Sequence, residues 1–207
     1  LPHEIWQTDA KGPFTVRIGE AEVGVHVLTI LDDKSRAVLA AIVSRSADLA
    51  TAVRLFRLAA ARYGLPAKLY CDRASIFDSL AFRTGLADLG VHRIRTRPRR
   101  PTARGKIEAY HRSLGRWFVR ELKHQVVRSL AHLEELLLGT IELLYQDHRH
   151  KELRTTPRLA LAGRISERRV PLERLEQAFF QVKRVKAHPK TGELTVEGRS
   201  LRLPSAL

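Results

Sequence analysis

The sequence predicts an α/β fold, in which helices flank a mixed five-stranded sheet and a small C-terminal β-barrel module follows. Short runs of β-branched and aliphatic residues alternate with segments of helical periodicity as far as residue 165. A strand, a helix and another strand follow one another between residues 37 and 71, which favours a parallel crossover. Past Arg169 the composition changes to short strands and turns. We therefore expect one domain over residues 1–165 and a small basic β module over residues 166–207.

The first three predicted strands form an antiparallel meander. Residues 3–10 alternate between the two faces of a strand, and Lys11-Gly12-Pro13 is predicted to turn the chain. Two aliphatic runs, Val23–Leu31 and Ala37–Val43, flank Asp32–Arg36, which has the composition of a hairpin turn.

The middle of the chain alternates helices with short strands. Asp48 is predicted to cap a helix that ends at Gly64, and residues 67–71 form a short buried strand. A helix over residues 78–89 and a strand over residues 91–94 complete the sheet. Because such crossovers are right-handed, the end of strand 67–71 should lie beside the first strand.

A basic stretch from Arg93 to Arg120 is the most unusual part of the sequence. No acidic residue lies between Asp88 and Glu108, and prolines 98 and 101 keep the stretch extended. Seven positive charges occur there, a density that suits phosphate neutralisation: Arg93, Arg95, Arg97, Arg99, Arg100, Arg104 and Lys106.

A helix is predicted to begin at Gly105, directly after this stretch. Its apolar stripe consists of Ile107, Tyr110, Leu114 and Trp117, and we expect Trp117 to be core. A different face of the helix carries Glu108, His111 and Arg112.

The last third of the chain begins with a strongly periodic helix. This helix covers residues 129–147, a charged connector follows, and Thr156-Pro157 begins a further short helix. In the tail, residues 179–185, 194–197 and 201–203 are predicted to be strands.

The composition favours a polyanionic partner. The 37 Lys and Arg residues outnumber the 22 Asp and Glu residues by 15, which indicates nucleic acid first. A ribosome-associated fold or a generally basic surface are the alternatives. A single cysteine excludes an internal disulfide, and no Cys/His spacing is typical of a zinc site.

The same composition predicts where the protein works. No apolar run is long enough to span a bilayer, so we expect a cytoplasmic protein without a membrane partner. No methionine occurs, even at position 1, which predicts that the chain is a portion of a longer protein.

Three acidic residues stand where the predicted topology brings elements together. Asp9 lies on the first strand, Asp72 follows the fourth strand, and Glu108 lies in the helix after the basic stretch. Carboxylates select hard cations such as Mg²⁺ and Mn²⁺, and two such ions can assist the displacement of a phosphodiester. The alternative is that each is an ordinary turn or surface acid.

The spacing of these acids resembles a known signature. The sequence places 62 residues between Asp9 and Asp72 and 35 between Asp72 and Glu108. This resembles the Asp, Asp, 35, Glu pattern of the retroviral integrase and DDE transposase superfamily. The surrounding motifs are also similar: Trp6-Gln7-Thr8-Asp9, Asp32-Asp33-Lys34-Ser35-Arg36, Gly64-Leu65-Pro66, Gly105-Lys106-Ile107-Glu108 with His111-Arg112, and His150 to Pro157. The tail resembles, more weakly, the small barrel of Mu-type bacterial transposases.

The resemblance implies a ribonuclease H-like fold with Asp9, Asp72 and Glu108 as ligands of two Mg²⁺ or Mn²⁺ ions. It implies a bacterial, nucleoid-associated transposase that cleaves transposon ends and joins them to target DNA as a homo-oligomer assembled on double-stranded DNA. The expected DNA contacts are Arg73, Arg97, Arg99, Arg100, Arg104, Lys106, His111 and Arg112.

One motif departs from the family pattern. Members usually have Asp-Asn-Gly-Ser where this chain has Asp72-Arg73-Ala74-Ser75. Arg73 is expected either to contact a DNA phosphate or to pair with a neighbouring acid. Two other functions stay open, a ribonuclease H-like nuclease without strand transfer and a catalytically silent DNA-binding assembly protein.

Overall fold

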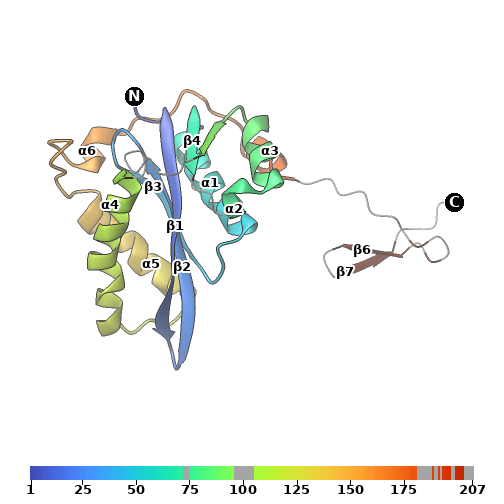
Figure 1. Ribbon diagram of the computed structural model, residues 1–207, viewed down its shortest axis with the longest axis horizontal. Helices are drawn as coiled ribbons and strands as arrows, with labels where there is room; N and C mark the ends of the chain where they lie inside the picture. The colour runs from blue at the N-terminus through green and yellow to red at the C-terminus, as the bar shows by residue number, and fades with distance from the viewer. Residues whose placement is uncertain are drawn as a thin grey trace.

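A mixed five-stranded sheet forms the centre of the molecule. This computed structural model describes residues 1–71, 75–95, 105–180, 188, 191, 193–196 and 199–202. The strand order is β3-β2-β1-β4-β5, so β1 is the middle strand (Figure 1). The strands are β1 (Ile5–Ile18), β2 (Ala21–Asp32), β3 (Val38–Ser44), β4 (Lys68–Cys71) and β5 (His92–Arg95).

The first two strands form one long antiparallel hairpin. Lys11-Gly12-Pro13, predicted to be a turn, instead lies inside β1 at an irregularity in the pairing with β2. The chain reverses between Ile18 and Ala21, where Gly19 has a left-handed backbone. The prediction of a turn at residues 11–13 was wrong because pairing along β2 outweighs the local turn composition.

The predicted parallel crossover is confirmed. Helix α1 (Leu49–Tyr63) connects β3 to β4, and β4 pairs in parallel with β1, with Thr8 opposite Cys71. Asp48 caps α1 as predicted, since its carboxylate accepts a hydrogen bond from the Thr51 amide at 2.8 Å. Gly64 ends the helix with a left-handed φ of 78°.

The helices cover both faces of the sheet, with α4 and α5 on one side and α1, α2 and α3 on the other (Figure 1). Their bounds are α2 (Ser75–Asp78), α3 (Leu80–Asp88), α4 (Gly105–Leu114), α5 (Leu130–Thr140), α6 (Pro157–Leu161) and α7 (Leu172–Gln177). Three short segments supplement them: the π-helical η2 (Gly115–Val119) and η4 (Ile141–Tyr145), and the 3₁₀ turn η3 (Glu121–His124).

The face under α1 and α3 is an aromatic core. Trp6, Phe56, Phe77 and Phe82 are all almost completely buried in one cluster. Ring centroids of Phe77 and Phe82 lie 5.8 Å apart, and those of Trp6 and Phe56 lie 6.1 Å apart. Each ring therefore contributes both buried area and fixed packing geometry.

The face under α4 and α5 contains a second core, in which two π-helical turns shift the predicted pattern. The Arg120 amide bonds the Gly115 carbonyl, an i to i+5 connection that adds a residue to the turn. As a result Phe118 is buried, whereas Trp117, predicted to be core, is only partly buried. The predicted helix 129–147 changes in the same way at η4, where Tyr145 is buried and Leu144 is half exposed.

The chain after residue 165 continues to pack on the aromatic core. Helix α7, which the sequence analysis did not predict, places Leu175 and Ala178 in the core, and Phe179 packs against it. The predicted division at residues 165/166 stays a prediction, but the chain up to Phe179 contributes to this core. Phe179 and Phe180, placed in a strand by the sequence analysis, lie in a turn after α7.

The described part of the tail is an antiparallel strand pair. Strands β6 (Glu193–Val196) and β7 (Arg199–Arg202) confirm two of the predicted tail strands. The described residues do not form a β-barrel, and residues 181–185 and 203 all lie outside them.

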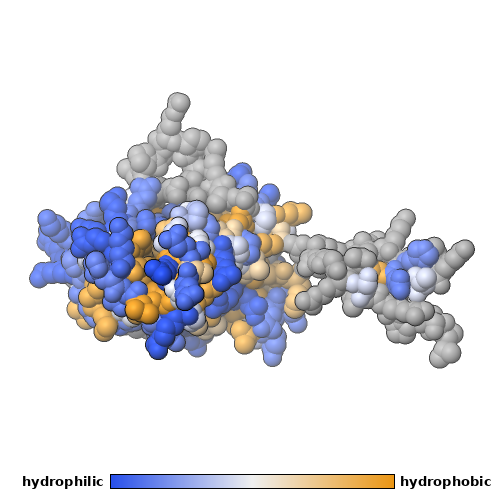
Figure 2. All heavy atoms as spheres, turned by 90° about the horizontal axis from the view of Figure 1, so that it is seen from below, coloured by the Kyte–Doolittle hydropathy of each residue, from blue (hydrophilic) through white to orange (hydrophobic). Residues whose placement is uncertain are grey.

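Most of the surface face drawn in Figure 2 is hydrophilic, with smaller hydrophobic patches. Within the described chain, no helix combines the length and the apolar character required to cross a bilayer.

Candidate active site

The site is built around Asp9 on the middle strand of the sheet. Its backbone pairs with Thr29 of β2, and its side chain is buried. Burying a carboxylate is costly unless polar groups contact it, so the polar side chains around Asp9 matter. Its Oδ2 atom lies 3.3 Å from Nδ1 of His111 on α4. This contact connects the strand carrying the first predicted catalytic residue to the helix carrying the last.

Helix α4 brings Glu108 to the same region. Ile107, Tyr110 and Leu114 bury one side of the helix in the second core, so the opposite side faces outward. Glu108 is exposed and lies one helical turn before His111, on a neighbouring position of the helix surface. The structure therefore brings Asp9 and Glu108 to adjoining elements, as the spacing predicted.

The third predicted ligand, Asp72, lies outside the described residues. Strand β4 ends at Cys71, which is opposite Thr8, the residue before Asp9. Asp72 directly follows Cys71 in the sequence.

The carboxylates of Asp9 and Glu108 fit a hard divalent cation. Oxygen ligands of this kind suit Mg²⁺ and Mn²⁺, and of the two side chains Asp9 is buried whereas Glu108 is exposed. Within the described ranges, no three His, Cys, Asp or Glu side chains form a group that could hold a metal ion. A complete metal site at this position therefore requires a donor outside those ranges.

The turn between β2 and β3 contains two acids with different roles. Asp32 is fully buried and accepts hydrogen bonds from the His3 amide at 2.7 Å and from the Ser35 amide at 2.8 Å. It shapes the turn, as its composition predicted. Asp33 points its carboxylate toward α4 instead.

Asp33 ties the beginning of α4 to β1. Its Oδ2 accepts from the Lys106 ammonium at 2.5 Å, and its Oδ1 accepts from the Gln7 side-chain amide at 2.6 Å. Gln7 precedes Asp9 by two residues, and Lys106 precedes Glu108 by two. This network therefore holds together the segments that carry both acids.

Two buried tyrosines brace the same helix. The rings of Tyr110 and Tyr145 meet edge to face at 4.9 Å, and the Tyr145 hydroxyl donates to the Arg36 carbonyl at 3.0 Å. Burial raises the pKa of both phenols far above their usual range, so both stay protonated.

The predicted DNA contacts separate into three groups. Arg112 is exposed on α4, as a phosphate contact requires. Lys106 is paired with Asp33, and His111 is buried against Asp9, so each of these two side chains already has a protein partner. The rest lie outside the described residues: Arg73, Arg97, Arg99, Arg100 and Arg104.

Two arginines of the basic stretch share one acid that sequence reasoning missed. Arg93 and Arg95 both pair with Asp78, at 2.9 Å and 2.5 Å. Side chains at positions 93 and 95 lie on one face of β5, and that alternation was the available signal. The single carboxylate offsets one of these two positive charges, so the net charge of the stretch is smaller than its composition indicates.

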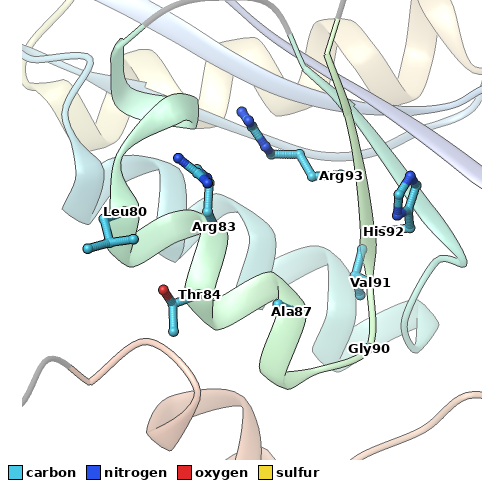
Figure 3. Close-up of a pocket in the computed structure, with 8 residues that line it drawn as sticks. All are labelled: Leu80, Arg83, Thr84, Ala87, Gly90, Val91, His92 and Arg93. Carbon is cyan, nitrogen blue, oxygen red and sulfur yellow. The ribbon is translucent and has the colours of Figure 1, made fainter.

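A pocket between α3 and β5 lies on another part of the molecule. It has a volume of about 630 Å³, and in Figure 3 Arg83 and Arg93 extend to the same side of it from α3 and β5. None of the described residues that line it is acidic, so they do not provide carboxylate ligands for a cation.

Comparisons with known proteins agree with this geometry. The family model described as Integrase core domain matches residues 1–101. A chain of the simian T-cell lymphotropic virus intasome in complex with the PP2A regulatory subunit B56 gamma is similar in structure, with a TM-score of 0.64 and 17% identity over 98% of this chain. This chain spans 66% of the length of that one.

Two isolated viral catalytic cores are also similar. One is the HTLV-2 integrase catalytic core domain, solved in complex with magnesium in a trimeric form, with a TM-score of 0.59 and 17% identity. The match covers 77% of this chain and 97% of the viral chain. The catalytic core domain of BIV integrase has a TM-score of 0.58 at 17% identity and covers 78% and 95%. At this identity the likeness establishes the ribonuclease H-like fold.

Proposed function

We propose that this chain, whose residues 1–101 match the family model described as Integrase core domain, is a DDE-type transposase that cleaves transposon ends and joins them to target DNA. One observation carries the proposal: the 3.3 Å contact between Asp9 and His111, which holds the helix of Glu108 against the strand of Asp9. Two carboxylates from adjoining elements, beside an exposed arginine, suit the displacement of a phosphodiester.

The chemistry consists of two successive displacements at phosphorus. Water first breaks a phosphodiester bond at the transposon end and leaves a 3′-hydroxyl. That hydroxyl then forms a new P–O bond with target DNA, and the target strand leaves with its own 3′-hydroxyl. No bond between protein and DNA forms, so the protein contributes positioning and charge.

Asp9, Asp72 and Glu108 are the residues that would hold two Mg²⁺ or Mn²⁺ ions. Such ions activate the attacking oxygen and stabilise the departing one. His111 orients the Asp9 carboxylate, and the Asp33 and Lys106 pair sets the start of α4. Arg112 and the basic residues before Gly105 position phosphates, which requires no base-specific contact.

The test is a joining assay with native transposon ends in the presence of Mg²⁺ or Mn²⁺. Glu108→Gln should abolish cleavage and joining, since it removes a cation ligand. DNA affinity should stay equal or rise slightly, because a negative charge near phosphates is lost. Glu108 is exposed and has no ion pair among the described residues, so the melting temperature should not change.

Glu135→Gln on α5 is the matched control, because it removes the same charge from another exposed helix position. It should leave turnover unchanged. A second readout is the rise in melting temperature on adding Mn²⁺, which should disappear in Glu108→Gln. Retained turnover in Glu108→Gln refutes the site, and cleavage without joining supports a ribonuclease H-like nuclease instead.

The remaining expectations belong to the same proposal. Acting on two DNA ends requires more than one protomer, so we infer a homo-oligomer assembled on double-stranded DNA. A bacterial cytoplasmic, nucleoid-associated location follows from that substrate.

A further inference from the structure

A second pocket lies beside helix α4. It has a volume of about 400 Å³ and is formed by α4, by Arg36 of the β2–β3 turn and by the connector between η4 and α6. Gly105, Lys106, Ala109 and Arg112 line it from the helix, and His150, Lys151 and Glu152 line it from the connector. This volume lies within the usual range of small-ligand sites.

The pocket has an excess of positive charge. The charge of Lys106 is offset by Asp33. Arg112 and Lys151 are both exposed, and the described part of the chain provides no ion pair for either. Arg36 is almost fully buried along its side chain and reaches one carboxylate, that of Glu152, at 3.3 Å. Three cations thus face the pocket against a single carboxylate.

A histidine adds an unused polar atom. Nε2 of His150 is buried and, within the described chain, has no hydrogen-bond partner. Leaving such an atom unpaired is costly, so a ligand that bonds it is favoured. Burial, followed by the nearby charges of His148 and Arg36, lowers the pKa of His150, so the ring is neutral near pH 7. A neutral imidazole can donate one hydrogen bond to a phosphate oxygen.

Glu152 forms only a weak ion pair with Arg36 in this pocket. Its side chain is 83% exposed, and exposed ion pairs contribute little to stability, typically about 0–1 kcal/mol. An anion that also contacts Arg112 and Lys151 makes more charged hydrogen bonds than Glu152 does.

We propose that this pocket binds a backbone phosphate of DNA through Arg36, Arg112 and Lys151, and that Glu152 takes the place of the phosphate at Arg36 when DNA is absent. The inference rests on the proposed function for the identity of the polyanion. It adds to that function a phosphate site in which the connector supplies Lys151.

The experiment measures the affinity of the whole chain for a short DNA duplex at several salt concentrations. Lys151→Ala and Arg112→Ala should each reduce the slope of log K against log salt by about 0.9, the value for one phosphate contact. Arg45→Ala removes one exposed charge at the end of β3, away from the pocket, and should leave the slope unchanged. Equal slopes in all three variants overturn the proposal.

Glu152 provides a test in the opposite direction. Glu152→Gln removes the competitor, so its DNA affinity should exceed that of Glu135→Gln, which removes the same charge from α5. Equal affinity in these two variants overturns the assigned role of Glu152. All substituted side chains are exposed, so unchanged melting temperatures exclude misfolding as the cause.

Inorganic phosphate separates DNA from a free anion as the ligand. At equal ionic strength, phosphate should raise the melting temperature no more than chloride does. If phosphate stabilises the wild type but not Lys151→Ala, and DNA slopes do not change, the pocket is a free-anion site and the proposal is wrong.

Joining assays run in parallel distinguish the two proposals. If Glu108→Gln retains full turnover, the proposed function is wrong. The salt slopes of the pocket variants then still test whether the pocket binds a phosphate. If the wild type joins DNA normally and the pocket variants have the same salt slope as Arg45→Ala, only the proposed phosphate site is wrong.

Discussion

The two faces of the sheet use the same strands differently. Under α1 and α3, aromatic rings contact one another directly, as Phe56 does with Phe82 at 6.4 Å between centroids. Under α4, polar contacts supplement the second core, as in the Asp9–His111 and Asp33–Lys106 pairs. Both faces supply stability through buried area, and the polar contacts of the second also fix the relative position of strand β1 and helix α4.

The largest stability effect should come from the aromatic face. Phe56→Ala removes a fully buried ring, and such changes cost about 3–5 kcal/mol in the free energy of unfolding. Phe180→Ala is the control, because its side chain is 73% exposed. Denaturant unfolding measures both variants. Equal losses would show that the aromatic cluster is not the stabilising face.

A truncation tests how far this face extends along the chain. Ending the chain after Arg168 removes Leu175, Ala178 and Phe179 from the core, and burying Leu175 alone accounts for about 1.5–3 kcal/mol. Ending it after Phe180 retains these contacts and should preserve the melting temperature. The sequence analysis alone placed the end of the core near residue 165, so equal stability of both truncations would support that earlier boundary.

Breaking the polar face should affect activity more than stability. Lys106→Met removes the partner of the half-buried Asp33 carboxylate. This should lower the free energy of unfolding by about 1–3 kcal/mol. The rate of joining should fall by more than this loss of stability explains. The Asp33–Lys106 ion pair, two residues before Glu108, no longer holds the start of α4 in place. Asp33→Lys combined with Lys106→Asp restores opposite charges and should recover part of the activity. An absence of coupling between the two positions in a double-mutant cycle would count against the anchor.

The aromatic face was easier to predict from sequence than the polar one. Trp6, Phe56 and Leu69 follow strand and helix periods, which are local signals. The contacts of Asp33 with Lys106 and of Asp9 with His111 join residues 73 and 102 positions apart, and no local pattern reports them. Asp9 and Glu108 were found because their spacing resembles a family signature.

The π-helical turns were missed for a related reason. Within η2 the apolar residues Trp117 and Phe118 are adjacent, so either fits a helical stripe. Packing against the second core selects Phe118, and the sequence cannot rank the two. The contact of His111 with Asp9 could not be predicted, because helix periodicity gives a face of α4 but not the element that this face meets.

The smallest expected effect is at Asp48, on the aromatic side of the molecule and away from the polar contacts. Asp48→Ala removes the N-cap of α1 and should cost about 1 kcal/mol. Hydrogen bonds from Ser46, then from Thr51, lower the pKa of Asp48 below its ordinary value of 3.8. Because the folded pKa is the lower one, this stabilisation is complete above the ordinary value and disappears as the pH falls through the folded pKa.

Melting curves of the wild type and Asp48→Ala should therefore differ by a constant amount from pH 7 to about pH 5 and converge below about pH 4. Asp48→Asn also caps a helix but does not titrate, so its difference from Asp48→Ala should not change with pH. Joining activity should be the same in all three proteins, since α1 packs on the face opposite α4. If Asp48→Ala loses joining activity while its DNA affinity is unchanged, the aromatic face also sets the position of the site. The proposed difference between the two faces would then be wrong.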